Sequence, residues 1–226
     1  MTTILSTTYC GPVQWYQKLY RSDLVLMECH ETFQKQTYRN RCVIATTNGP
    51  QTLTVPVERG TSPFIRDIRI SNHGNWRHQH WHAQMSAYNE SPFFDYYQDD
   101  FRPFFENQYN FLYDFNTEIC RKVCELIDIQ PNIRETTSYR SAGVRPLPPP
   151  SPWRGSLTSN PSSLISHPSS NPIDLRSSIN PKHPDADAHF IPRRYYQVYE
   201  RKHGFQPNLS IIDLLFNMGP ESIFWL

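Results

Sequence analysis

The sequence predicts a mixed α/β fold in which N-terminal strands and a hairpin are followed by helices. Short β-prone and apolar runs fill the first part of the chain, and Asn48-Gly49 separates two of them. From Trp76 onward the apolar residues recur mostly at helical spacing. The length of 226 residues suits one domain with insertions and is short for two.

The first expected strands flank a helix. Residues 3–6 form a β-prone run, and residues 24–27 form a continuous apolar run, as in a buried strand. Between them, Gly11 and Pro12 turn the chain into a helix that reaches Tyr20.

A hairpin is expected next. Residues 41–47 and 52–57 flank Asn48-Gly49, which is the strongest short hairpin signal. Isoleucines within residues 65–70 predict another strand, which ends at Ser71.

Helices are expected over most of the second half. One covers residues 76–89, and the next follows Ser91 as N-cap with Pro92 in its first turn. A longer helix carries an apolar stripe over residues 112–126, and the last starts at Ser210 and stops near Gly219-Pro220.

A Pro/Ser-rich segment interrupts this pattern near the C-terminal end. Residues 146–184 hold ten Pro and ten Ser in 39 residues, too few apolar groups to offset the entropy of ordering. We expect residues 146–189 to be a disordered insertion in a single domain formed by residues 1–145 and 190–226. Its Pro-rich start, residues 146–152, is a candidate docking site for a protein partner in extended form.

Charge and cysteine usage restrict the function classes. Lys+Arg is 22 and Asp+Glu is 21, so the formal net charge is +1, which argues against a nucleic-acid partner. No apolar run approaches the length of a membrane helix, and no secretory signal is found. The five cysteines lack metal-finger spacing, so free thiols and a cytoplasmic location are expected, with no cofactor.

A histidine-rich segment, residues 73–82, holds four of the nine histidines. On a helix, Trp76, His80, Gln84 and Tyr88 form one stripe, and His80 falls inside the apolar sector. His80 is therefore the histidine expected to face a pocket. The alternative is a core histidine with a hydrogen-bond partner.

A metal site in the same segment is disfavoured. As a strand, the segment would put His78, His80 and His82 on one face, but no acidic or thiol partner lies nearby.

Two arginines form a second candidate site. Arg39 and Arg41 lie two residues apart on the approach to a strand and would point the same way, so they could grip a phosphate or carboxylate. The alternative is a solvated face paired with Glu28 or Glu31.

Cys10 is a third candidate, at an apparent strand-to-helix turn where amide groups lower a thiol's pKa. A Cys10–His80 nucleophile is conceivable, and a small apolar residue at a tight turn is the alternative.

The chain resembles the bacterial WbqC-like family. The matching stretches, in order, are Tyr9-Cys10-Gly11-Pro12-Val13-Gln14-Trp15-Tyr16, Tyr38-Arg39-Asn40-Arg41, Trp76 with His80 and Tyr88, and Leu209-Ser210-Ile211-Ile212-Asp213-Leu214-Leu215-Phe216-Asn217-Met218-Gly219. Two departures are Thr7-Thr8, where the family typically has Gln-Pro, and Cys10, where it usually has an aromatic residue.

The resemblance implies a role in surface polysaccharide and O-antigen assembly. The function it suggests is transfer of an acyl or aminoacyl group to a nucleotide-linked amino sugar, with a nucleotide sugar and an acyl donor as substrates. His80 would be the general base, Tyr88 would polarise the acyl carbonyl, and Asp213 would orient His80. The residues expected to bind substrate are Arg39, Asn40, Arg41, Trp76 and Gln14. The rival is a non-catalytic protein that binds a nucleotide sugar or a partner of the same pathway.

Overall fold

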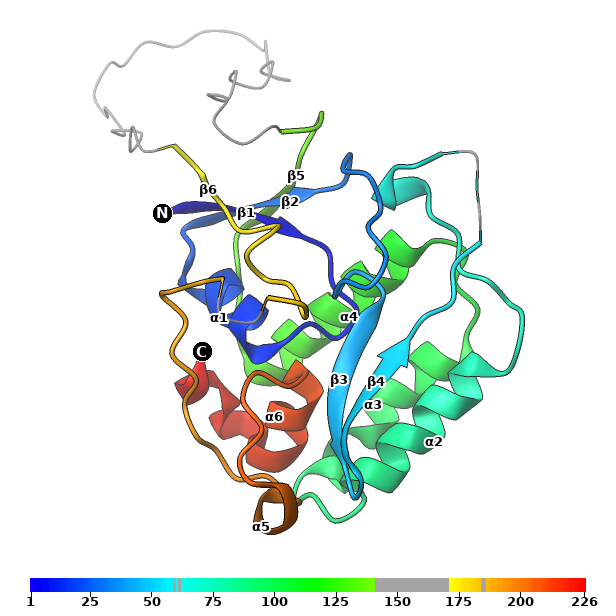
Figure 1. Ribbon diagram of the computed structural model, residues 1–226, viewed down its shortest axis with the longest axis vertical. Helices are drawn as coiled ribbons and strands as arrows, with labels where there is room; N and C mark the ends of the chain where they lie inside the picture. Colours follow the sequence, from blue (N-terminus) through cyan, green and yellow to red (C-terminus); the bar gives the residue numbers. More distant parts are fainter. Residues whose placement is uncertain (59, 61, 141–170, 184–185) are drawn as a thin grey trace, which may run out of the picture.

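A parallel sheet lies at one end of the molecule, and an antiparallel hairpin lies among the helices that make up the rest (Figure 1). The computed structural model describes residues 1–58, 60, 62–140, 171–183 and 186–226. The mixed α/β class expected from the sequence is confirmed.

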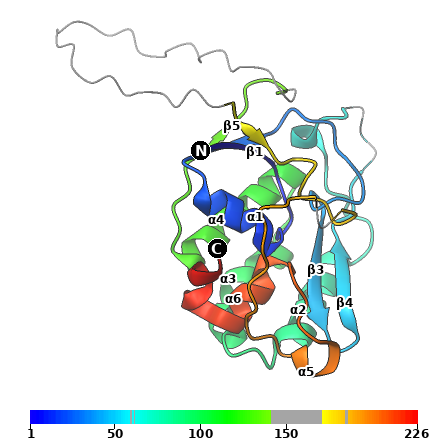
Figure 2. The ribbon, with the colours of Figure 1, turned by 60° about the vertical axis from the view of Figure 1, so that its left-hand side comes forward.

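The parallel sheet has four strands in the order β5-β2-β1-β6. Its central strands are β1 (Thr2–Ser6) and β2 (Leu24–Glu28), paired so that Ser6 lies opposite Glu28. The edge strands β5 (Ile133–Glu135) and β6 (Ile173–Asp174) are also parallel to their neighbours. All four strands therefore end at the same edge of the sheet. Figure 2 shows from a second side that the sheet lies above α1 and α4.

Helix α1 (Val13–Arg21) connects β1 to β2, because parallel neighbours need a crossover connection. The strand–helix–strand order expected for this part of the chain is confirmed. The connection between β1 and α1, residues 7–12, is buried along its whole length. A buried connection needs internal partners, and one is the hydrogen bond from Tyr9 N to Tyr38 O at 2.9 Å.

The predicted hairpin is present as β3 (Arg41–Thr46) and β4 (Gly49–Thr54). Gly49 has φ of +100°, a backbone conformation that favours glycine. The hairpin packs against helices α2 and α6.

Four helices supply nearly half of the buried apolar core: α2 (Trp76–Tyr88), α3 (Phe94–Glu106), α4 (Leu112–Ile127) and α6 (Ile211–Met218). Phe216 of α6 is fully buried, with its ring edge-on to Tyr88, Phe94 and Phe101. A short helix α5 (Glu200–His203) precedes α6, and a 3₁₀ turn η2 (Gly219–Trp225) follows it. The predicted helices at residues 76–89, 112–126 and from Ser210 are confirmed within a residue or two.

Two local predictions are wrong. The isoleucine-rich segment forms a 3₁₀ turn η1 (Ile65–Asp67) and isolated bridges, because its apolar side chains reach the core without a strand ladder. Ser91 does not cap α3, which begins at Phe94; the Ser91 hydroxyl instead donates to Asn217 Oδ1 at 3.1 Å, a tertiary partner that local sequence does not reveal.

The expected disordered insertion, residues 146–189, is described only in part. Residues 171–183 are described and include β6, so the expectation is wrong there. β6 is ordered by its pairing with β1 and by its ion pairs, which the Pro/Ser composition conceals. Residues 146–170, with the candidate docking segment 146–152, lie outside the described part. That residues 1–145 and 190–226 form one domain stays a prediction.

Candidate functional site

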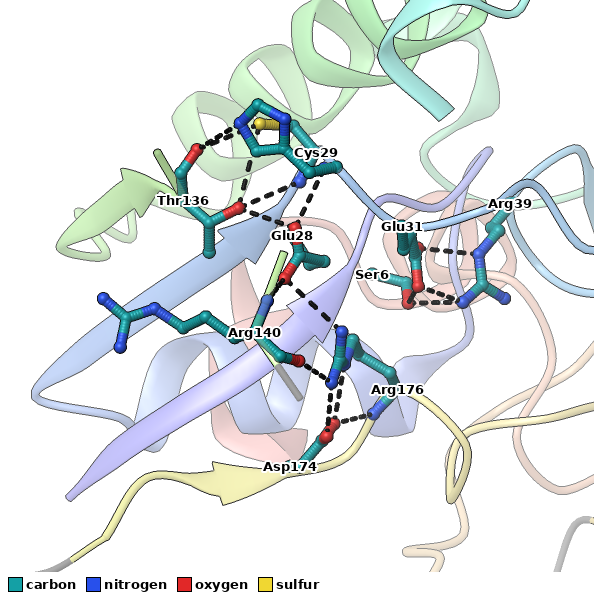
Figure 3. A network of polar contacts seen from close by, with 10 residues as sticks. Ser6, Glu28, Cys29, Glu31, Arg39, Thr136, Arg140, Asp174 and Arg176 are labelled. Atoms are coloured by element: carbon teal, nitrogen blue, oxygen red, sulfur yellow. Dashed lines mark hydrogen bonds and ion pairs between the residues drawn. The ribbon is translucent and has the colours of Figure 1, made fainter. Parts of the chain in front are cut away.

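Polar side chains gather where the four parallel strands end (Figure 3). Ser6 and Glu28 are the last residues of β1 and β2, Thr136 follows β5, and Asp174 ends β6. In open sheets of parallel strands, ligands bind in the crevice outside the carboxyl ends of the strands. This carboxyl edge is therefore the candidate functional site.

Arg39 and Glu31 form a buried ion pair at the carboxyl edge. Arg39 Nε donates to Glu31 Oε1 at 2.7 Å, and Nη2 donates to Oε2 at 2.6 Å. Ser6 Oγ accepts from the same Nη2 at 2.8 Å and donates to Glu31 Oε2 at 3.1 Å. Arg39 therefore pairs with Glu31, one of the two carboxylates expected for a solvated face. The pair is buried and not solvated, because the side chains of Arg39 and Glu31 are only 4% and 6% exposed.

Glu28 is the most enclosed carboxylate of the edge, with no exposed surface. Its Oε1 accepts from His30 N at 2.9 Å and from Thr136 Oγ1 at 2.7 Å. Its Oε2 accepts from Arg140 N at 2.8 Å and from Arg176 Nη1 at 3.4 Å. Four donors thus compensate the charge, as burial of a carboxylate requires.

Arg176 joins this carboxylate to the end of β6. Its Nε and Nη2 grip Asp174 at 2.9 and 2.6 Å, and Nη2 also donates to the carbonyl of Arg140. Burial alone would raise the pKa of Asp174, but the hydrogen bonds from Arg176 outweigh it and lower that pKa. The hydrogen bond to Asp174 raises the pKa of Arg176, so both groups stay ionised.

Two hollows open at this edge. A cavity of about 530 Å³ lies between the sheet and α4, lined by Thr7, Thr8 and Trp15 together with residues of β2, β5 and α4. Half of the lining residues are polar or charged, although most of the exposed surface of the cavity is apolar. A cleft of about 400 Å³ is lined by Glu31, Arg39, Tyr139, Asp174 and Arg176. A narrow gap lined by Thr7, Thr8, Arg39 and Arg176 lies between them. We refer to these two hollows as the apolar cavity and the charged cleft.

His80 lies elsewhere, inside the helical core. Its Nδ1 is 2.9 Å from the Tyr9 hydroxyl, and its ring packs against Trp76 and Tyr9. Burial lowers the pKa of His80 to about 4, partly offset by a hydrogen bond with the backbone of Thr54. His80 is buried, as expected for a residue on the apolar side of its helix. It was also expected to face a pocket, but it lines neither the apolar cavity nor the charged cleft.

Tyr88 and Asp213 lie next to each other but not next to His80. Asp213 accepts from Tyr195 at 2.7 Å and from Gln197 at 3.2 Å, and in the described residues no hydrogen bond joins it to His80. The Tyr88 hydroxyl approaches the same carboxyl group without hydrogen-bond geometry. Burial raises the pKa of Asp213 to about 6, although the neighbouring side chains of Tyr195, Tyr88 and Gln197 act to lower that pKa.

The other expected substrate-binding residues are dispersed. Asn40 donates to Val55 O at 2.9 Å, and Trp76 Nε1 donates to Ser71 O at 3.1 Å. Gln14 donates to Asp187, which also pairs with Lys18. Arg41 is half-buried at the start of β3. Of the expected residues, only Arg39 lies at the carboxyl edge; their roles stay predictions.

The thiols and histidines give no reactive cluster in the described residues. Cys10 is buried in the turn before α1, with φ of +42°, and its carbonyl accepts from Ser210 Oγ. All five cysteines are buried and free. The ring centroids of His78 and His82 lie 3.9 Å apart, but no group of three or more metal-binding side chains occurs within the described ranges. No helix there is long and apolar enough to cross a membrane.

Sequence patterns did not point to Thr136, Asp174 or Arg176. Thr136 follows a three-residue strand with exposed side chains, and the other two lie in the Pro/Ser-rich segment. The signal that could have found them is the polar residue at the end of each strand. This signal can be recognised only after the strands and their order are known.

Comparison with known proteins identifies relatives along most of the chain. The model of the WbqC-like protein family matches residues 7–224. A protein of Mycobacterium tuberculosis (strain ATCC 25618 / H37Rv), Rv1507c, whose description is uncharacterized, is 28% identical over 199 residues, which cover 84% of this chain and 81% of the relative. No solved structure matches.

Replacing His80 by Gln should change how stability depends on pH. The unfolded chain binds a proton at His80 near its ordinary pKa of about 6.5, whereas the folded chain does so only near 4, so His80 makes unfolding easier as the pH falls between these values. We expect His80→Gln to cost about 1–3 kcal/mol at pH 7.5 through the lost Tyr9 partner, and about 2 kcal/mol less at pH 4.5. Urea unfolding at both pH values measures this. The exposed His82 on the same helix gives the control, His82→Gln; a pH-independent cost at residue 80 would contradict the expectation.

Asp213 should have the opposite effect in an overlapping window. Because the folded-state pKa is about 6 and the unfolded value about 3.9, the folded chain keeps a proton that the unfolded chain has lost, and stability falls as the pH rises through this window. Asp213→Asn should therefore gain stability relative to wild type between pH 4 and pH 7.5, by about 2 kcal/mol. Thermal or urea unfolding tests this, and the control is Asp99→Asn, at an exposed residue of α3. A constant difference across the range would show that Asp213 does not titrate in this way.

Proposed function

The chain belongs to the WbqC-like protein family, and on this premise we propose that it transfers an acyl or aminoacyl group to the amine of a nucleotide-linked amino sugar in surface polysaccharide synthesis. The observation that carries the proposal is the pair of hollows at the carboxyl edge, with the narrow gap lined by Thr7, Thr8 and Arg39 between them. A reaction between two substrates needs two subsites that meet, because positioning both reactants removes much of the barrier.

The two hollows differ in polarity, as do the acyl donor and the sugar. The apolar cavity, with Trp15 and Met27 in its wall, suits an acyl donor, and the charged cleft suits a polar sugar. In the proposed step the sugar nitrogen forms a bond to the acyl carbon, the bond from that carbon to its leaving group breaks, and the nitrogen gives up a proton to a base. The proton then passes to the leaving group or to water.

If His80 is this base, a path must carry the proton from the hollows to its ring. The imidazole is neutral at pH 7, as a base must be, but a pKa of about 4 makes it a weak acceptor of the amine proton, and its Nδ1 is held by the Tyr9 hydroxyl. Since neither residue lines the hollows, a proton would have to pass through Tyr9, two residues from Thr7. Transfer activity in His80→Gln separates a base from a packing residue.

A non-catalytic protein that binds a nucleotide sugar or a pathway partner is the second candidate. One observation favours it: the carboxylates of the cleft are already paired with arginines, and in the described lining of both hollows no histidine is present. Such a protein would hold the ligand without a side chain ready to accept its proton.

Thermal-shift screening against UDP- and dTDP-linked amino sugars and acyl-CoAs tests the proposal. A ligand at 100 times its Kd stabilises the folded state by about 2.7 kcal/mol, so a true substrate should raise the Tm by several degrees. Mixtures of ligands that bind should then yield a product with the mass of the sugar plus the acyl group. We expect Gln34→Ala, at an exposed residue of the charged cleft, to weaken the shift and Arg201→Ala, an exposed change on α5, to leave it unchanged.

The outcomes separate the two candidates. Binding of an amino-sugar nucleotide with no product from any acyl donor would favour the binding protein over the transferase. The absence of any shift across the panel would contradict the transferase and the nucleotide-sugar-binding protein, and would point toward a protein partner.

A further inference from the structure

The charged cleft is enclosed by ions that are already matched with one another. Glu31 pairs with Arg39 at 2.6 Å, and Asp174 pairs with Arg176 at 2.6 Å, so the lining carries two negative and two positive charges. Glu28, behind Arg176 at 3.4 Å, adds a third carboxylate. These five groups sum to one negative charge, and a phosphate dianion entering the cleft would meet no unmatched cation among them.

The cleft still offers hydrogen-bond donors. Arg39 uses Nε and Nη2 on Glu31 and Ser6, and in the part of the chain that the structure describes its Nη1 donates no hydrogen bond (Figure 3). The guanidinium is 96% buried and lines the cleft, so its position is fixed while two N–H groups remain. Because Glu31 offsets its charge, a neutral acceptor such as a hydroxyl group suits Nη1 better than an anion.

The cleft also offers acceptors. A carboxylate has about four lone-pair sites, and Asp174 and Glu31 each accept three hydrogen bonds in the described structure. Each keeps room for one more donor. Together with the side chains of Gln34 and Ser177, they match a ligand that carries several hydroxyl groups and an amine.

Tyr139 supplies an aromatic wall. Tyr139 is 56% exposed, and the Arg176 guanidinium carbon lies 5.0 Å from its ring centroid. That contact covers one face with a cation. A tyrosine ring combines an apolar face with a polar hydroxyl, so it can pack against the C–H groups of a sugar ring while its rim meets hydroxyl groups.

We propose that the charged cleft is the subsite for the ring of an amino sugar, and that it excludes phosphate. Arg39 Nη1 donates to a ring hydroxyl, the carboxylates of Asp174 and Glu31 receive hydroxyl or ammonium hydrogens, and the ring lies on Tyr139. The inference rests on the proposed function for the choice of an amino sugar, and it replaces the expected phosphate grip of Arg39 by a hydroxyl contact.

The test uses the full chain with D-glucosamine, D-glucose and inorganic phosphate as probes in NMR titrations at pH 7. We expect D-glucosamine to bind several-fold more tightly than D-glucose, and inorganic phosphate not to compete with it. Tyr139→Ala should weaken D-glucosamine binding at least fivefold. Tyr96→Ala, at a more exposed tyrosine outside the cleft, should leave it unchanged.

Three results would overturn the subsite: no saturable binding of D-glucosamine, competition by phosphate, or equal affinity in wild type and Tyr139→Ala. Arg39→Ala is avoided because it leaves Glu31 as an unpaired buried charge, and the resulting loss of stability would confuse folding with binding.

An acyl-transfer assay keeps this inference separate from the proposed function. Transfer that is unaffected in Tyr139→Ala would remove the subsite and leave the transferase. Tyr139-dependent sugar binding without transfer from any acyl donor would keep the subsite and remove the transferase.

Discussion

The arrangement of the candidate site depends on the buried pairing of Arg39 with Glu31. Taking each ion out of water costs several kcal/mol, so neither is tolerated without the other and its hydrogen bonds. The pair also engages the Ser6 hydroxyl at the end of β1, while Asn116 of α4 donates to the carbonyl of Arg39 at 2.8 Å. One interaction thereby links the sheet, the approach to the hairpin and the helix beneath the sheet. The two hollows at the carboxyl edge take their shape from that link.

Arg176 has the matching role at the other side of the edge. It connects Asp174 at the end of β6 with Glu28 at the end of β2, and its contact with the carbonyl of Arg140 draws in the segment that follows β5. Because each guanidinium is matched by a carboxylate, the edge is highly polar without being strongly charged. This distinguishes it from a phosphate site, in which helix amides or unmatched cations face the ligand. A polar, nearly neutral cleft beside an apolar cavity is instead suited to a sugar and a second, less polar reactant.

Local patterns predicted the elements that are long or strongly marked, such as the apolar run of β2, the Asn48-Gly49 hairpin and the stripe of α4. They also predicted that His80 faces the apolar side of its helix. They failed for β5 and β6, which have three and two residues and owe their order to pairing with a central strand. Without those strands the carboxyl edge cannot be recognised, so the sequence pointed to Arg39 but not to the network that holds it. Its partner Glu31 could be guessed from proximity in sequence, whereas its burial depends on the tertiary fold.

Hydrogen–deuterium exchange with and without the best nucleotide-sugar ligand tests most directly whether the carboxyl edge is the binding site. The account predicts slower exchange on ligand binding in residues 6–9, 28–32, 136–140 and 174–177, which come together only at this edge. Helices α2 and α3, which border a separate cleft lined by His78 and Arg102, should exchange at the same rate in both states. Protection confined to α2 and α3, with the four edge segments unchanged, would contradict the account.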